Sequence, residues 1–263
     1  MVRRRLKDKR VLKLIRAFLN AGVMENGLVS PTEEGTPQGG PLSPLLSNLL
    51  WDERDQELQG RGHRFIRYAD DCNMDVGSQR AGERVMRSVT EFLTKKLRLK
   101  VNESKSAVAR PWERKFLGFS FTIDRRPKRR LAPQTVRRFR ERVRELTRRT
   151  RGISVIHMAE QLRSYLIGWT GYFGWCETPS VLRDLESWIR RRIRCVIWKQ
   201  WQRGTTRYAE LRSRGVGRGL AAQTAGSAHG PWRLSRSPAL SFAFPSSWFE
   251  RLGLPRLSIS RAT

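Results

Sequence analysis

One stretch, residues 63–75, restricts the fold of this chain more than any other. It reads His-Arg-Phe-Ile-Arg-Tyr-Ala-Asp-Asp-Cys-Asn-Met-Asp, so that β-favouring residues lead into two adjacent carboxylates, Asp70 and Asp71. The Asp-Asp-Cys-Asn break predicts a strand, a tight turn and a return strand. Acids at the tip of a rigid hairpin can hold hard divalent cations through oxygen ligands. The stretch predicts a metal-binding hairpin; the alternative is an ordinary solvated turn, in which Asp and Asn are common.

The charge balance indicates a polyanionic partner. The chain has 53 Lys and Arg against 24 Asp and Glu, a formal net charge of +29. Such an excess repels itself unless a polyanion supplies the compensating charge. Nine tryptophans are interleaved with the basic residues, which distinguishes the chain from a disordered basic tail. RNA or DNA is therefore the expected partner, bound with an affinity that falls steeply as salt rises.

The cysteines and the hydropathy pattern indicate the compartment. Cys72, Cys176 and Cys195 are isolated from one another, which argues against a structural zinc and favours a reducing environment. No apolar run approaches the roughly 18 residues that cross a bilayer, and no signal peptide opens the chain. We expect a cytoplasmic protein with no membrane contact.

Apolar residues recur at helical spacing in much of the chain, and short alternating runs lie between some of these segments. The last three helical segments are joined by short loops, which is typical of an antiparallel bundle. The fold class expected is therefore α+β, a region of mixed helices and strands followed by a three-helix bundle. The pattern predicts helices over residues 3–20, 42–58, 81–97, 133–151, 153–172 and 179–201, and strands over residues 98–101 and 115–122.

Two further segments carry candidate binding chemistry. Residues 35–44, Gly-Thr-Pro-Gln-Gly-Gly-Pro-Leu-Ser-Pro, place adjacent glycines before a helix, where a phosphate and a flat base pair can approach the main chain. The alternative is a plain loop–helix junction. The helix predicted over 133–151 carries Arg137, Arg140 and Arg144 with few acids to pair them, so we expect a nucleic-acid backbone-binding face rather than a merely solvated one.

Four short blocks follow one another in a fixed order: Pro-Gln-Gly-Gly, Tyr-Ala-Asp-Asp, Asn-x-x-Lys-Ser and Lys-Phe-Leu-Gly-Phe. Together they resemble the palm of a bacterial group II intron-encoded reverse transcriptase/maturase, and the resemblance covers nearly the whole chain. It implies a partial reverse-transcriptase palm over residues 1–125, which is an antiparallel sheet with helices on one face, and a helical thumb, or maturase domain X, over 126–203. A small irregular C-terminal segment that binds nucleic acid would occupy 204–263.

The resemblance also implies roles for individual residues. Asp70 and Asp71 would be catalytic ligands of Mg²⁺, Tyr68 would touch the primer end, and Lys105 would act as a proton donor near the triphosphate. Group II intron RNA, template–primer nucleic acid and target DNA would be the partners. The nucleotide would lie against Pro37, Gln38, Gly39 and Gly40, the primer grip would be Phe116, Leu117 and Gly118, and Trp169, Tyr172 and Phe173 would pack the thumb bundle.

The chain departs from the family pattern upstream of Gly35. The family places a further catalytic carboxylate there, on a strand with the pattern D-x-x-x-x-F-D, and basic fingers precede it. In this chain the acids upstream of Gly35 are Asp8, Glu25, Glu33 and Glu34, and we expect none of these four to lie in a strand. Paired cysteines of an H-N-H endonuclease are also missing at the other end.

Three functional readings follow. The first is the C-terminal part of an RNA-directed DNA polymerase and maturase, inactive in polymerisation alone and completed by a fingers-containing segment or separate chain. The second is a maturase-type RNA-binding module that assists intron splicing without catalysis. The third is the product of a broken reading frame with no function.

Overall fold

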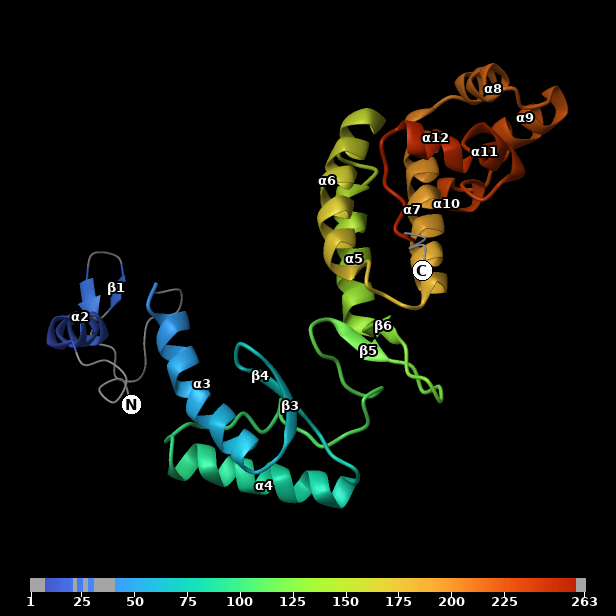
Figure 1. Ribbon diagram of the computed structural model, residues 1–263. Helices are drawn as coiled ribbons and strands as arrows, with labels where there is room; N and C mark the ends of the chain where they lie inside the picture. The colour runs from blue at the N-terminus through green and yellow to red at the C-terminus, as the bar shows by residue number, and fades with distance from the viewer. Residues whose placement is uncertain (1–7, 21–22, 26–27, 31–40, 259–263) are drawn as a thin grey trace. The chain divides into compact units, whose positions relative to one another are not determined.

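The computed structural model describes residues 8–20, 23–25, 28–30 and 41–258, which divide into two compact units, Met1–Ala109 and Arg110–Thr263 (Figure 1). Helices dominate, and the strands form three separate two-stranded antiparallel sheets. The α+β class is confirmed. One larger sheet with helices on one face is not what the described residues form, because each sheet is a local hairpin of two consecutive strands. No helix in these ranges combines the length and apolarity that a membrane span requires.

In the first unit, three predicted helices are present and a hairpin was missed. The missed hairpin pairs Glu25 with Leu28, so one upstream acid does lie in a strand, contrary to expectation. Strands of three residues are too short to show an alternating pattern. The helices are α2 (Lys9–Asn20), α3 (Ser43–Gly60) and α4 (Gln79–Lys95), and the strands are β1 (Val23–Glu25), β2 (Leu28–Ser30), β3 (Arg64–Tyr68) and β4 (Asp71–Asp75).

The strand predicted over residues 98–101 is wrong. The chain leaves α4 through Arg98, whose φ of +55° lies in the left-handed region. The Leu99 N–H then donates to the Leu93 carbonyl at 2.9 Å, which satisfies one of the helix's terminal acceptors. The short alternation of basic and apolar residues here belongs to a helix terminus rather than to a sheet.

The second unit is built on three helices that follow a short hairpin. Pro opens α5 and α7, where the missing N–H costs no hydrogen bond, and the Ser154 hydroxyl accepts from His157 N–H to cap α6. Their apolar stripes meet in one core that contains Phe139, Leu162 and Ile193. The elements are β5 (Phe119–Phe121), β6 (Arg129–Leu131), α5 (Pro133–Leu146), α6 (Val155–Phe173) and α7 (Pro179–Gln200).

The C-terminal region is helical, not irregular as expected. Of the five short helices that follow α7, α10 lies beside α7, while α8 and α9 pack against each other and against α11 (Figure 1). The buried Leu211, Leu240 and Phe249 of these helices extend the same core. Helices of four to ten residues are too short for periodicity to reveal them, and tertiary burial stabilises them instead. They are α8 (Gly204–Ser213), α9 (Arg218–Ala225), α10 (Pro231–Leu234), α11 (Pro238–Ala243) and α12 (Ser246–Arg251).

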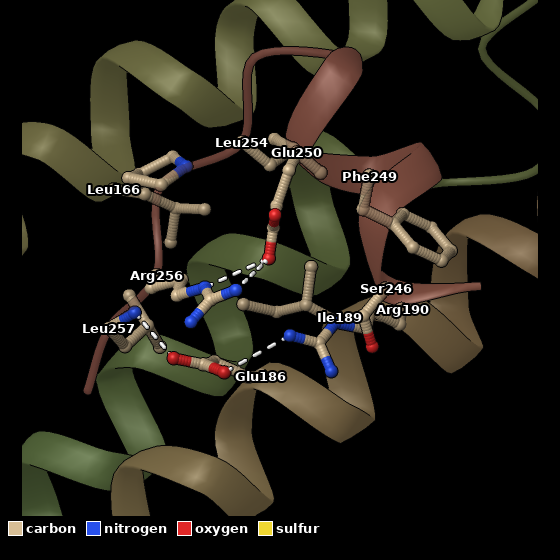
Figure 2. Close-up of a pocket in the computed structure, with 11 residues that line it drawn as sticks. Leu166, Glu186, Ile189, Arg190, Ser246, Phe249, Glu250, Leu254, Arg256 and Leu257 are labelled. Atoms are coloured by element: carbon tan, nitrogen blue, oxygen red, sulfur yellow. Dashed lines mark hydrogen bonds and ion pairs between the residues drawn. The ribbon is translucent and has the colours of Figure 1, made fainter. Parts of the chain in front are cut away.

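A buried carboxylate fastens the end of the described chain to α7 (Figure 2). Glu186 Oε1 accepts the main-chain N–H groups of Leu257 at 2.6 Å and Ser258 at 2.8 Å, while Arg190 lies 3.2 Å from Oε2. The gap that remains beside these groups measures about 20 Å³, which is room for a water molecule rather than a ligand. This site therefore anchors the tail and is not a binding pocket.

The strand predicted over 115–122 begins only at Phe119. Phe116 and Phe119 exchange two main-chain hydrogen bonds of 2.9 Å around a tight turn, in which Leu117 and Gly118 have φ of +52° and +80°. Two successive positive φ values are typical of a type I′ turn. The turn is held against the helices, since Thr135 donates to the Gly118 carbonyl at 2.7 Å and Tyr172 to the Leu117 carbonyl at 3.1 Å.

Replacing the anchoring carboxylate should destabilise the second unit. Glu186→Leu leaves two buried main-chain N–H groups without an acceptor, and we expect the free energy of unfolding to fall by about 3 kcal/mol in urea titrations. Asp184→Leu removes an exposed acid from the same helix and should change it by less than about 0.5 kcal/mol. Equal effects of the two substitutions would contradict the anchoring role.

The turn at Gly118 gives a second prediction. A Cβ there would lie 2.8 Å from Phe173 Cε1 and would sit at positive φ, so Gly118→Ala should lower the free energy of unfolding by about 1–3 kcal/mol. Gly171→Ala, inside α6 with nothing within 4 Å of the new Cβ, should raise it by about 0.5–1 kcal/mol. Thermal unfolding of both variants measures the difference. Equal destabilisation by Gly118→Ala and Gly171→Ala would mean that the loss is not specific to the turn.

Candidate functional site

The predicted acidic hairpin is present, with its turn one residue earlier than expected. Tyr68 ends β3 and pairs with Asp71, the first residue of β4, so that Ala69 and Asp70 form the two-residue turn. Ala69 has φ of +52°, a conformation that costs roughly 1–2 kcal/mol for a residue other than glycine. Both carboxylates are exposed. They are available to a ligand and not enclosed in an apolar core.

One face of the hairpin is uncovered within the unit. Cross-strand partners share a face, so the register places Tyr68 with Asp71 and Ile66 with Asn73 on the same side. Ile66 and Tyr68 are 61% and 62% exposed, unusually open for large side chains in a sheet. An aromatic ring, an aliphatic side chain and a carboxylate therefore lie together on a surface that other groups can reach.

The opposite face carries a brace that the sequence pattern did not reveal. Arg67 Nε donates to Asp55 Oδ2 of α3 at 2.6 Å, and its Nη1 donates to Asn48 Oδ1 and to the Ala69 carbonyl, each at 3.2 Å. Arg54, 4% exposed, lies on the other side of Asp55 at 3.1 Å. The only signal in the sequence was a charged residue, Arg67, on the apolar side of an alternating strand. This network holds the strained turn against α3.

The two acids suit a hard cation but do not form a complete site among the described residues. Exposed carboxylates can share a cation with water molecules, as magnesium sites often do. Within the described ranges, no three His, Cys, Asp or Glu side chains come together as a metal-binding group. A clamp for two metal ions therefore needs at least one further oxygen ligand besides Asp70 and Asp71.

The other predicted site residues fall in different places. Lys105 is exposed in a turn of the first unit that begins at Asn102, whose side-chain oxygen accepts the Lys105 N–H at 3.2 Å. Phe116, Leu117 and Gly118 form the tight turn of the second unit. Pro37, Gln38, Gly39 and Gly40 lie outside the described residues.

Arginine side chains cover the outer face of α5. Arg137, Arg140 and Arg144 follow one another at i, i+3 and i+7 and are exposed, while Phe139 and Val143 point into the core. Arg140 and Arg144 lie 5.9 and 5.8 Å from the centre of the Trp188 ring. The structure thus gathers the three predicted arginines on one stripe.

A second set of arginines, on α7, donates to main-chain carbonyls. Arg191 donates to Trp232 O at 3.0 Å, Arg192 to Thr147 O at 3.1 Å, and Arg194 to Phe244 O at 2.6 Å. Burial lowers the pKa of each of the three guanidinium groups, and neighbouring arginines lower it further. A carbonyl has no net charge, so these bonds leave the positive charge of the three guanidinium groups uncompensated.

The predicted aromatic signature packs the bundle at two of its three positions. Trp169 is buried with its ring centre 4.4 Å from that of Phe139, and Phe173 lies 4.9 Å from Trp169. Tyr172 is 49% exposed and reaches the Leu117 carbonyl instead. The signature therefore joins the three-helix core to the turn.

Two known families match this chain in consecutive regions. Residues 3–121 match the reverse transcriptases (RNA-dependent DNA polymerase), and residues 136–215 match the maturase-specific domain of group II introns. These regions contain the acidic hairpin and the arginine-covered helices, respectively.

Individual proteins match the sequence of this chain over shorter segments. Protein YkfC of Escherichia coli K12 is 47% identical over 60 residues, 23% of this chain and 16% of that protein. Group II intron-encoded protein LtrA of Lactococcus lactis subsp. cremoris is 45% identical over 56 residues, 21% of this chain and 9% of its own length. An uncharacterised 91 kDa protein in the cob intron of Schizosaccharomyces pombe is 34% identical over 61 residues, 23% of this chain and 8% of that protein.

The matched segments thus span less than a fifth of each of these relatives. The reverse-transcriptase region is nevertheless followed along the chain by the maturase-specific region, and a group II intron-encoded protein is among the relatives. This chain belongs to the group II intron-encoded reverse transcriptase/maturase family.

Proposed function

We propose that this chain supplies the catalytic hairpin and the thumb of an RNA-directed DNA polymerase that also acts as a maturase. The observation that carries the proposal is the exposed pair Asp70 and Asp71 at the tip of a braced hairpin, inside the region that matches reverse transcriptases. The palm would extend to residue 125, the thumb over 126–203 and a nucleic-acid-binding segment over 204–263.

The carboxylates would hold Mg²⁺ beside a primer end. The bound ion would stabilise the negative charge that develops on the attacking and leaving oxygens. In this arrangement Tyr68, on the same face as Asp71, would contact the primer terminus, and Lys105 would donate a proton near the triphosphate. Residues 37–40 would line the incoming nucleotide, and the turn at 116–118 would grip the primer backbone.

A further segment would complete the site. The described part of the first unit has few buried apolar side chains, namely Ile15, Leu58, Val89 and Leu97. Its open hairpin face offers Ile66 and Tyr68 for packing, and a two-metal clamp needs a further carboxylate. We propose that a fingers-bearing segment, in the same polypeptide or a separate one, provides both the packing and the ligand. The chain alone would then bind RNA without extending a primer.

The second candidate is a splicing cofactor that binds intron RNA and performs no catalysis. The exposed stripe on α5 favours it, because three arginines on one helix face present positive charge to the phosphates of a nucleic-acid backbone. Both candidates require intron RNA as a partner. For either, the three free cysteines suit the reducing cytoplasm.

Asp70→Asn should separate catalysis from binding. The substitution removes one negative ligand atom, so primer extension by this chain together with a fingers-bearing segment should fall by at least about 100-fold, with RNA affinity unchanged. Asp75→Asn changes an exposed acid at the end of β4 that is far from the turn, and it should leave extension intact. Robust Mg²⁺-dependent extension by the chain alone, lost in Asp70→Ala, would refute the need for a completing segment.

The α5 stripe can be tested by charge reversal of Arg137, Arg140 and Arg144 to Glu. We expect this change to weaken RNA binding whatever the RNA sequence, and to lower the slope of log K against log salt concentration by about 3 in magnitude. Filter binding across a salt series measures both effects. The matched control reverses three exposed arginines with nearly the same spacing on α4, Arg80, Arg84 and Arg87. Equal losses from both sets would mean that net charge alone, and not the thumb face, governs affinity.

A further inference from the structure

A cavity of about 330 Å³ opens between three elements of the second unit that are distant in sequence. Its walls come from the end of α5 and the residues after it, from one stripe of α7, and from α10. At this volume it lies at the lower end of the range of about 300–1,000 Å³ that is usual for ligand pockets. The lining residues are Arg144, Thr147, Arg149, Trp188, Arg192, Cys195 and Trp232.

The charged groups of this cavity are all positive. Arg144, Arg149 and Arg192 line it, and no Asp or Glu is among the lining residues. Arg192 is fixed in place, since its Nε donates to Thr147 Oγ1 at 2.5 Å and its Nη2 to Thr147 O at 3.1 Å. Carbonyl and hydroxyl acceptors hold the guanidinium without neutralising it. The cavity therefore favours an anionic ligand.

Two tryptophan rings supply the apolar walls. Trp188 is half-buried, and the guanidinium of Arg192 lies 5.5 Å from its ring centre. Trp232 is 39% exposed and has the Arg191 guanidinium 3.7 Å from its ring centre. The thiol of Cys195 also lines the cavity; it is 4% exposed, and burial raises its pKa, so it stays a neutral, weakly polar group.

A cavity with positive charge and tryptophan walls can distinguish an unpaired nucleotide from a duplex. A duplex presents its phosphates on a convex surface, which the exposed stripe of Arg137 and Arg140 can meet. A duplex cannot place a base inside a cavity, because its bases are stacked and paired. An unpaired nucleotide can stack its base on aromatic side chains while arginines contact its phosphate.

We infer that this cavity binds one unpaired nucleotide of an RNA chain, with its base against Trp188 and Trp232 and its phosphate beside Arg144 and Arg149. The inference rests on the proposed RNA-binding function and adds to it a site selective for single-stranded RNA. The protein would then recognise a junction at which a duplex, held by the α5 stripe, ends in an unpaired nucleotide.

The test compares two labelled RNAs by fluorescence anisotropy, a blunt hairpin and the same hairpin with a short unpaired extension. The full-length chain should bind the extended RNA roughly tenfold more tightly, as expected for one stacked base. Trp188→Leu and Arg149→Gln should abolish this preference while leaving affinity for the blunt hairpin within about twofold. Trp188→Phe, which keeps an aromatic ring, should retain most of it.

Matched controls lie outside the cavity. Trp175→Leu changes a tryptophan that is 51% exposed, and Arg183→Gln changes an exposed arginine of the same helix as Trp188. Both should keep the preference. If Trp188→Leu does not fold, Trp232→Ala on the short α10 replaces it, and circular dichroism verifies the fold of each variant.

Several outcomes would overturn the inference. The first is that the unchanged protein binds the two RNAs with equal affinity. The others are that the cavity variants keep the preference for the extended RNA, or that the control variants lose this preference. An extension of DNA that binds as tightly as one of RNA would overturn the assignment to RNA. Failure of the proposed function is a different result, because then neither hairpin would bind and charge reversal on α5 would change nothing.

Discussion

The second unit depends on guanidinium groups of α7 that donate to the carbonyls at which other elements end. Arg192 binds the carbonyl of Thr147, where α5 ends, and Arg194 binds that of Phe244, where α11 ends. The last carbonyls of a helix lack partners inside the helix, so a neighbouring cation both satisfies them and complements the helix dipole. One central helix thus fixes the positions of elements that are distant in sequence. Since carbonyls are neutral, the fold is stabilised without reducing the positive charge that nucleic acid would meet.

The first unit uses arginine differently. Arg54 and Arg67 lie on either side of Asp55, so that this acid is engaged within the unit and braces the hairpin. Asp70 and Asp71 remain at the exposed end. The same residue type therefore serves two purposes: in one unit it supports a turn that presents negative charge, and in the other it preserves positive charge. The proposed polymerase function would need both, because it would hold cations at the reacting phosphates and a polyanion along the protein.

Much of the helical architecture could be predicted because apolar residues recur about every 3.6 residues along the long amphipathic segments. The helices observed as α3 to α7 lie within a few residues of their predicted ranges. Short elements failed for a physical reason. The alternation at residues 98–101 is a helix terminus in which Arg98 adopts a left-handed conformation, and α8 to α12 form only because burial stabilises them. Of the candidate site, Asp70, Asp71 and the α5 arginines could be proposed from local pattern, whereas the brace through Arg67 could not.

By itself, the sequence determined the charge excess, the order of the family blocks, the long helices and the pair of adjacent acids in a hairpin, because each is a local property of the chain. Only the tertiary structure decided which arginines donate to carbonyls and which stay exposed. It also decided that Arg149, Trp188 and Trp232 line one cavity, although they come from the loop after α5, from α7 and from α10. Such proximity depends on the packing of apolar faces across the core, and no spacing along the chain encodes it.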